Sequence, residues 1–334
     1  MITKEVAELI QNKNVSMYEL AEKTLNEKLS LTEDETKIVS DLDTHFKEIG
    51  KRGFDEKHEI SSFMERVINE EIYNAPDELL DLLFDRDTIT ENDDFVSVKE
   101  PKNTLVAYEA AKGGNVDRSF LDTNVLRPIW KNFQVETDIS YADLAKNGWK
   151  TIALYTDYAT AALKNKMFKV IFDMIDAGIT SGAANYITES STTLTEASAD
   201  AAALYIQDVA GYGVGTFVAR SKYIQQMSKF KTFTSPEIIN EVHRTGKAGV
   251  YDGIALTPIS GTKKLGDGTD LMVDKRVFGI ADKIGSLNMK GDINVYQDAN
   301  NDKEKFHLSF KNFTFGVAFN KDTLEKVCKI AIAW

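Results

Sequence analysis

The stretch that decides the fold is residues 154–182, LYTDYATAALKNKMFKVIFDMIDAGITSG. Its apolar side chains return every three or four residues and therefore share one face of a helix, interrupted only by Asn165. This face consists of Leu154, Tyr158, Ala161, Phe168, Phe172, Ile175 and Ile179, and it is widened by Met167, Ile171 and Met174. At about 1.5 Å per residue the helix would span about 43 Å, and Gly178 and Gly182 offer places for it to end. We predict one long helix that acts as the structural backbone of the chain.

The residues before this helix read as a long hairpin. Residues 105–108 and 129–136 have the character of strands, and a polar stretch with a Gly113-Gly114-Asn115 turn separates them. A loop of this length is unusual inside a compact domain, which indicates that it has a use of its own. We therefore expect a hairpin that projects from the body of the protein.

Residues 190–290 alternate between predicted helices and strands, and a strand-rich part follows them. The expected elements are an alanine-rich helix opened by a capping box at 193–196, strands at 216–219 and 251–256, a helix from Ser235-Pro236-Glu237 to about Gly246, a loop at 260–270, a strand at 271–281, a long strand at 306–319 and a short helix at 321–325. The pattern contains no internal repeat and indicates an α+β architecture.

Residues 1–85 predict several short helices. Thr32 and Glu35 have the spacing of a capping box, and Ile38, Leu42 and Phe46 lie on one narrow apolar stripe. Because the stripe is narrow, we expect these helices to be buried against one another or against a neighbouring chain. The residues that follow, up to 103, are polar and acidic, which favours an extended linker or arm.

The excess of acidic side chains is confined to the first third of the chain. The protein has 334 residues and a net charge of −12. Residues 1–100 hold 26 Asp and Glu against 12 Lys and Arg, whereas residues 101–334 hold 26 against 28. The isoelectric point, near 5.0, argues against a cationic nucleic-acid binder, and a single cysteine excludes a disulfide scaffold. The abrupt change of charge indicates two differently built parts.

No motif in the sequence forms a convincing site for catalysis, a cofactor or a metal. The glycines of 211–215 follow a predicted helix and precede a strand, the reverse of a dinucleotide-binding turn, so they are better explained as a helix end. Asp298, Asn300 and Asp302 resemble the start of a calcium loop, but Lys303 stands where that loop needs glycine. A solvated hairpin turn explains them better.

The remaining candidate groups for chemistry are scattered. The four histidines lack the spacing of metal ligands, and Cys328 lies in an apolar stretch where it should pack as a small hydrophobic residue. The chain begins without a secretory signal. No window reaches the roughly 18 apolar residues that a membrane-spanning helix needs. These observations predict a protein that is not an enzyme, carries no cofactor, and does not bind a membrane.

The order of elements over residues 96–334 resembles tailed-bacteriophage major capsid proteins of the Hong Kong 97-like fold. An extended arm, a long hairpin, a short helix at 141–146, the spine helix, a mixed domain and a late long strand follow one another as they do in that family. The stretches Gly253-Ile254-Ala255-Leu256, Val277-Phe278-Gly279-Ile280-Ala281 and Phe315-Gly316-Val317-Ala318-Phe319 resemble strands of that fold. The acidic residues 1–85 are not part of the shared fold.

The resemblance implies a division of the chain into named parts. These are an acidic helical N-terminal segment at 1–85, an extended N-arm at 86–102, an E-loop hairpin at 103–138, a peripheral domain with the spine helix at 139–185, an axial domain at 186–290, return strands of the peripheral domain at 291–319, and a C-terminal helix and strand at 320–334.

A shell subunit would need projections that meet its neighbours, and two segments offer such contacts. The candidates on the hairpin carry both charge signs and an apolar group expected to be exposed on a monomer: Asp117, Arg118, Phe120, Leu121, Asp122, Val125, Leu126 and Arg127. The candidates on the axial loop are Lys263, Lys264, Asp267 and Asp270, which would ring a fivefold or sixfold axis.

The predicted function is that of a major capsid subunit. It would assemble with itself through pentamers and hexamers into an icosahedral shell that encloses double-stranded DNA without sequence-specific binding. Scaffolding and portal proteins would be its further partners, assembly would occur in the host cytoplasm, and the protein would reside in the virion. Two alternatives remain open: the shell protein of an encapsulin-like nanocompartment, and an α+β enzyme or ligand-binding protein.

Overall fold

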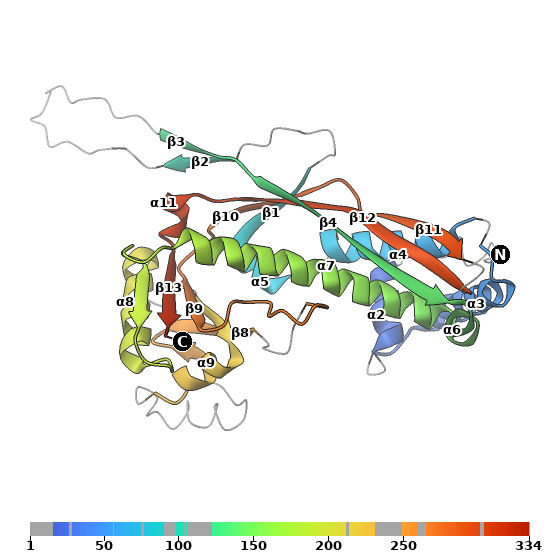
Figure 1. Ribbon diagram of the computed structural model, residues 1–334, viewed down its shortest axis with the longest axis horizontal. Coiled ribbons are helices and arrows are strands. Elements are labelled where there is room, and N and C mark those ends of the chain that lie inside the picture. The colour runs from blue at the N-terminus through green and yellow to red at the C-terminus, as the bar shows by residue number, and fades with distance from the viewer. Residues whose placement is uncertain are drawn as a thin grey trace, which may run out of the picture.

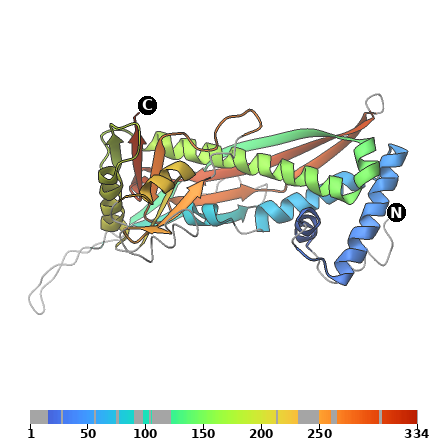
Figure 2. The ribbon, with the colours of Figure 1, turned by 90° about the horizontal axis from the view of Figure 1, so that it is seen from below.

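The computed structural model describes residues 16–26, 29–55, 57–74, 77–89, 98–102, 105, 122–211, 214–230, 249–259, 265–300 and 304–333. The described body is elongated, and helix α7 (Trp149–Gly178) runs along it (Figure 1). A mixed lobe lies at the C-terminal end of α7, and the helices of residues 17–69 lie towards its other end (Figures 1 and 2).

The prediction of one long helix is confirmed by the spine helix α7. The prediction of its buried face is right for the C-terminal half and wrong for the N-terminal half. It begins five residues before the predicted start and ends at Gly178. In its C-terminal half Phe168, Phe172 and Ile175 are buried, as predicted. In its N-terminal half Tyr158 is 62% exposed, and Ala161 is exposed.

The buried side of the N-terminal half of α7 contains threonines that the apolar pattern overlooks. Thr156 and Thr160 are fully buried. Each hydroxyl donates to the carbonyl four residues earlier, at 2.8 and 2.9 Å, so neither buried oxygen lacks a partner. The helix can therefore turn this side inward and leave Tyr158 outside.

One sheet of five strands forms the peripheral part of the molecule. Its strands are β1 (Phe84–Ile89), β4 (Ile129–Ser140), β10 (Gly285–Lys290), β11 (Asn294–Asn300) and β12 (Lys305–Ala318). Strand β12, predicted at 306–319, is central: β4 runs along one edge, and β11 and β10 share the other. Strand β4 therefore pairs with the return strand β12, a pairing that was not predicted.

A ribbon of two strands that pair with each other lies in the region of the predicted hairpin. These are β2 (Val98–Lys102) and β3 (Asp122–Leu126), in antiparallel register. Of the predicted strand 105–108, only Leu105 falls within the described residues, and the Gly113-Gly114-Asn115 turn falls outside them.

A second sheet of six strands forms the mixed lobe, in the order β5-β13-β9-β6-β8-β7. The strands are β5 (Tyr186–Glu189), β6 (Thr216–Arg220), β7 (Val250–Tyr251), β8 (Ile254–Ile259), β9 (Arg276–Ile280) and β13 (Val327–Ile332). Helices α8 (Glu196–Ala210) and α9 (Ser221–Met227) pack on this sheet, and α11 (Lys321–Leu324) precedes β13.

Three predictions in this lobe need correction. The capping residue of α8 is Thr195 rather than Thr193, since the Thr195 side chain accepts from the Ser198 amide. The expected strand 251–256 is a tight hairpin of β7 and β8, because Asp252 and Gly253 both have positive φ. The expected strand 271–281 is confined to β9. The predicted helix at 235–246 lies outside the described residues.

The N-terminal helices share a hydrophobic core with α7 and the five-stranded sheet. They are α2 (Met17–Leu25), α3 (Glu33–Arg52), α4 (Glu59–Asn69), the π-helical turn η1 (Glu70–Asn74) and α5 (Glu78–Leu83), and α6 (Tyr141–Asn147) packs beside α3. Phe46 stacks on Trp149 of α7 with ring centroids 6.1 Å apart. The capping box of Thr32 and Glu35 is confirmed. The change of charge near residue 100 is therefore not a change of core.

An ion cluster joins the spine helix to the second sheet. Asp176, in the last turn of α7, binds Arg276 Nε of β9 at 2.9 Å and Lys329 Nζ of β13 at 2.8 Å. Lys329 also donates to the carbonyls of Asp176 and Ile179, at 2.7 and 3.1 Å. A lysine that is 5% exposed thus satisfies carbonyls at the negative end of the helix dipole.

A close crossing fixes α3 against α6. A Cβ at Gly50 would lie 2.4 Å from the backbone nitrogen of Ala145 and 2.8 Å from the carbonyl carbon of Leu144. Because both contacts are backbone, no side chain can move to make room. Glycine at this position sets how closely the N-terminal helices approach the body.

We predict that Gly50→Ala lowers the free energy of unfolding by about 1–2 kcal/mol. Overpacking costs typically about 1–3 kcal/mol, of which the better helix propensity of alanine offsets at most about 1 kcal/mol. Denaturant unfolding measures the change. Gly266→Ala is the matched control, since a Cβ there meets nothing within 4 Å; equal stability of the two variants would contradict the crossing.

We predict that Lys329→Met destabilises the protein by about 3 kcal/mol, because it leaves Asp176 with one cation and leaves helix carbonyls without a donor. The control is Lys326→Met, since the Lys326 side chain is 34% exposed and pairs with Asp282 near the surface. A surface pair of this kind contributes at most about 1 kcal/mol. Thermal and denaturant unfolding of both variants test the difference, and a loss of equal size in both would refute it.

Candidate assembly surfaces

The ribbon of β2 and β3 stands apart from the two main sheets in the described part of the chain (Figure 1). Asp122 lies opposite Lys102 in its register, and Val125 lies opposite Lys99. Leu126 is only 2% exposed, so it is not one of the exposed apolar side chains expected here. Arg127 is exposed. The other four hairpin candidates, Asp117, Arg118, Phe120 and Leu121, lie outside the described residues.

The axial loop offers fewer free charges than its sequence indicates. Lys263 and Lys264 lie outside the described residues. Asp270 is already paired within the chain, with its Oδ2 2.6 Å from Arg220 Nη2. Asp267 is exposed, and the hydroxyl and backbone amide of Thr269 donate to it. Those hydrogen bonds lower the pKa of Asp267, so this carboxylate stays charged.

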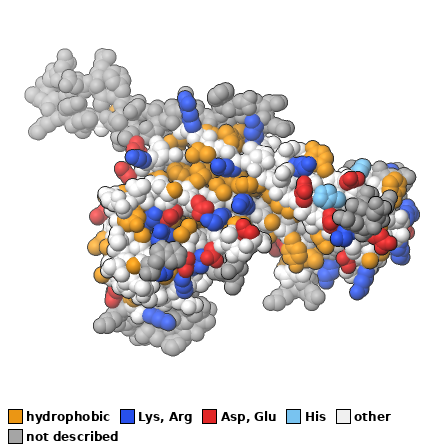
Figure 3. All heavy atoms as spheres, viewed as in Figure 1, with side chains coloured by type: hydrophobic (Ala, Val, Ile, Leu, Met, Phe, Trp, Pro, Cys, Tyr) orange, Lys and Arg blue, Asp and Glu red, His pale blue; other side chains and the backbone are white. Residues whose placement is uncertain are grey.

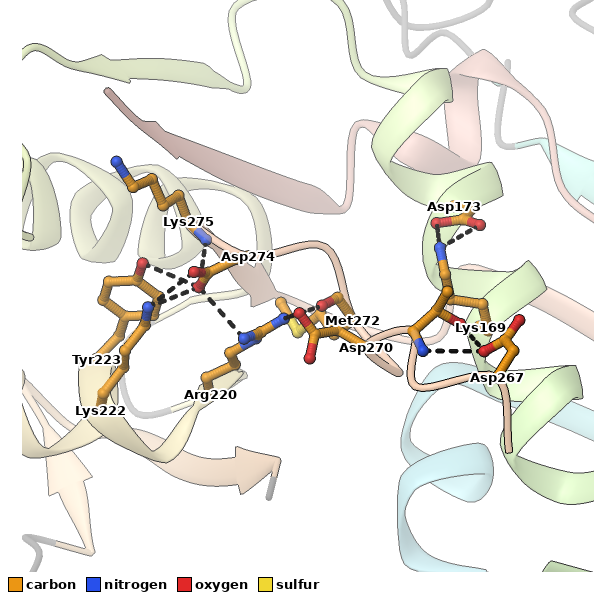
Figure 4. A network of polar contacts seen from close by, with 11 residues as sticks. Lys169, Asp173, Arg220, Lys222, Tyr223, Asp267, Asp270, Met272, Asp274 and Lys275 are labelled. Carbon is orange, nitrogen blue, oxygen red and sulfur yellow. Dashed lines mark hydrogen bonds and ion pairs between the residues drawn. The ribbon is translucent and has the colours of Figure 1, made fainter. Parts of the chain in front are cut away.

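The pairing of Asp270 belongs to a network that holds the loop to the second sheet (Figure 4). Arg220, at the end of β6, also donates to the Met272 carbonyl at 2.8 Å. Asp274 accepts from Lys222 and Tyr223 of α9. Burial alone would raise the pKa of Asp274, but the hydrogen bond from Lys222 and the charge of Arg220 lower it overall. The C-terminal part of the loop is thus anchored by charge.

The other part of the described loop lies against the spine helix. Leu265, Gly266 and Asp267 line a hollow of about 270 Å³. The remaining walls come from β4 and α7, through Phe133, Gln134, Val135, Ala162, Leu163 and Lys166. The loop therefore bridges the second sheet and the spine helix, a contact that the sequence analysis missed because nothing local in the sequence signals it.

Large apolar side chains are exposed at places that the sequence analysis did not single out. Leu204 and Val209, on α8, are 59% and 45% exposed, and Val214 in the following turn is 49% exposed. Figure 3 also shows apolar side chains gathered over the middle of the face along α7. Exposed apolar groups of this kind mark contact surfaces.

The residues that could take part in metal or thiol chemistry are neither clustered nor activated in the described part of the chain. They contain no group of three or more His, Cys, Asp or Glu side chains placed to hold a metal ion. Burial raises the pKa of the Cys328 thiol to about 12, so it stays protonated. Gly211 ends α8 with a φ of 91°, which confirms the helix-end interpretation of the glycine run. Among the described helices none is long and apolar enough to cross a membrane.

Comparison with known proteins gives a family and a fold. The family model described as "SPbeta prophage-derived putative capsid protein YonB" matches residues 2–265. No curated protein matches the sequence significantly. A solved structure from Gordonia phage Cozz has a TM-score of 0.52 at 12% identity, over 75% of this chain and 85% of that chain.

Two further solved structures have similar scores. A chain of the bacteriophage PhiM1 mature capsid has a TM-score of 0.49 at 14% identity, over 74% of this chain and 85% of that one. The capsid of cyanophage P-SCSP1u has a TM-score of 0.49 at 12% identity, over 79% and 94%.

The family match covers most of the chain and includes the acidic N-terminal segment, which the family therefore shares. The structural likeness confirms the predicted fold class. The chain thus belongs to this prophage capsid protein family, and it is a structural protein with the Hong Kong 97-like fold of tailed-phage major capsid proteins.

Proposed function

We propose that this capsid protein assembles through pentamers and hexamers into an icosahedral shell that encloses double-stranded DNA, without acting as an enzyme. Assembly takes place in the host cytoplasm with scaffolding and portal proteins, and the product is the virion. The observation that carries this proposal is the family match, joined to an elongated subunit whose ribbon, spine and second sheet spread its surface widely (Figure 1).

The form of the subunit supports assembly through many small contacts. The ribbon of β2 and β3 reaches away from the body, and Arg127 follows it as an exposed charge. A projection on one subunit that meets a different surface on the next gives heterologous contacts, which close into rings. Each contact is weak, but a contact repeated around every subunit makes assembly strongly favourable.

The charge distribution supports enclosure of DNA rather than tight binding. Residues 101–334 carry 26 acidic and 28 basic side chains, close to neutrality. A strongly positive lining would release many counterions on binding DNA and would hold the packaged molecule in place. A nearly neutral body can surround DNA and still let it leave.

The division of the chain proposed from the sequence is retained, with a more definite role for residues 1–85. Helices α2 to α5 bury Ile38, Leu42 and Phe46 in the core that contains α7. We therefore assign this segment the task of stabilising the subunit for assembly, through its support of the spine helix.

Electron microscopy of the expressed full-length protein tests the proposed function. Rings of five or six subunits, or closed shells, are expected. Closed shells that carry enzyme cargo would favour a nanocompartment instead. A strictly monomeric protein at all concentrations, with a saturable small ligand, would overturn the proposal.

We predict that Arg127→Glu raises the concentration at which assembly begins about fivefold, because an exposed ion pair contributes up to about 1 kcal/mol per contact. Light scattering against protein concentration measures this threshold, and circular dichroism checks the fold. Lys51→Glu is the matched control, an exposed charge reversal on α3, which lies at the other end of the molecule from the ribbon (Figure 1). Equal threshold concentrations for the two variants would show that Arg127 does not take part in the contact.

A further inference from the structure

The N-terminal helix α2 is attached to the spine helix across an acid-lined cavity. The cavity has a volume of about 320 Å³ and lies between α2, α4, η1 and α7. Its lining residues are Tyr18, Ala21, Glu22, Leu25, Asn26, Val67, Glu71, Ala153 and Asp157. The lining combines apolar side chains with three carboxyl groups, a phenol and an amide.

Two neighbouring carboxylates of the π-helical turn hold the two helices. Glu70 Oε2 accepts from the Ser16 hydroxyl and from the Tyr18 amide, both at 3.0 Å, and so caps the start of α2. Glu71 Oε1 accepts from Lys164 Nζ of α7 at 3.1 Å. The wider π turn places adjacent residues against different helices, which is how π-helical turns often serve functional sites.

The charges around the cavity do not balance. Glu22 of α2, Glu71 of η1 and Asp157 of α7 line it, and Lys164 forms an ion pair with Glu71. The Glu71 side chain is 14% exposed, so water screens it poorly. With all three carboxyl groups ionised, three negative charges line the cavity, and the ion pair with Lys164 compensates one of them.

The titration of these groups follows from their burial. Burial raises the pKa of Glu71, although the charge of Lys164 opposes the rise. Asp157 is exposed by surface area, and its partial burial against the cavity still raises its pKa, with the charge of Lys164 opposing the rise. Because a raised carboxyl pKa means that the docked state holds protons more tightly than the released state, docking is strengthened as pH falls through that range. It weakens as pH rises above it.

We propose that the contact of α2 with η1 and α7 is a proton-controlled latch, which closes when the carboxyl groups of Glu71 and Asp157 take up protons and loosens when they ionise. The latch would let the acidic N-terminal helix part from the spine without unfolding the subunit. It concerns the single chain and does not rest on the proposed assembly.

The other contacts of α2 do not compete for this control. The apolar side chains of Met17 and Leu20 are fully buried in the docked helix and carry no group that titrates. Lys23 pairs with Glu35 of α3 at 2.6 Å, and the hydrogen bond from Lys23 lowers the pKa of Glu35, so this pair stays ionised while the cavity carboxyls titrate. Burial and the nearby acids raise the pKa of Tyr18, which stays neutral through the same range.

Hydrogen exchange of the unassembled full-length chain, from mildly acidic to mildly alkaline pH, tests the latch. After correction for intrinsic exchange rates, the opening constant of residues 17–25 is compared with that of residues 196–210 in α8. We expect the ratio to rise with pH, by up to about tenfold per pH unit for each proton released within the titrating range. A ratio that does not change with pH overturns the proposal.

Variants separate the latch from general loosening. The double variant Glu71→Gln and Asp157→Asn should remove the rise, and Lys164→Met should open α2 further wherever the carboxyls are ionised. Glu33→Gln, an exposed acid on α3, is the control that should keep the wild-type rise. An undiminished rise in the double variant contradicts the assignment of the latch to these two groups.

Discussion

The arrangement of the molecule depends on how the last turn of one helix is held. Asp176 stands between Arg276 and Lys329, and Lys329 also satisfies the carbonyls that end α7. This cluster fixes the direction in which the second sheet leaves the spine. A subunit of a shell must repeat one geometry in many copies. A junction with charge-assisted hydrogen bonds in several directions tolerates fewer alternatives than an apolar contact of equal area.

The N-terminal segment packs against the other end of α7. Its helices pack around Trp149, and β1 then extends the five-stranded sheet by parallel pairing with β10. The segment is therefore built into the hydrophobic core, and the family match includes it. Its acidic character describes its outward surface and not a separate body.

The sequence predicted the local elements better than their partners. The long strand 306–319, the helix 321–325 and the capping box of Thr32 followed from local chemistry, and the structure confirms them. The pairing of β4 with β12 could not be predicted from local chemistry, because strand pairing joins residues that are far apart in the chain. Periodicity shows that a helix has an apolar face but not which of two such faces is buried. Tyr158 was therefore placed on the wrong side.

The contact residues were harder to predict than the fold, and for a related reason. Nothing in the local sequence marks Lys329 as a junction residue, because the fold supplies its acceptors, and Asp270 was predicted as a free contact residue although Arg220 pairs with it. A charged side chain carries no local sign of its partner, and burial alone decides how much its charge matters. In the described part of the acidic segment many carboxylates are exposed, and exposed charges contribute little to stability. Glu71 is turned inward by a π-helical turn, so its ionisation affects packing and couples pH to the position of a helix.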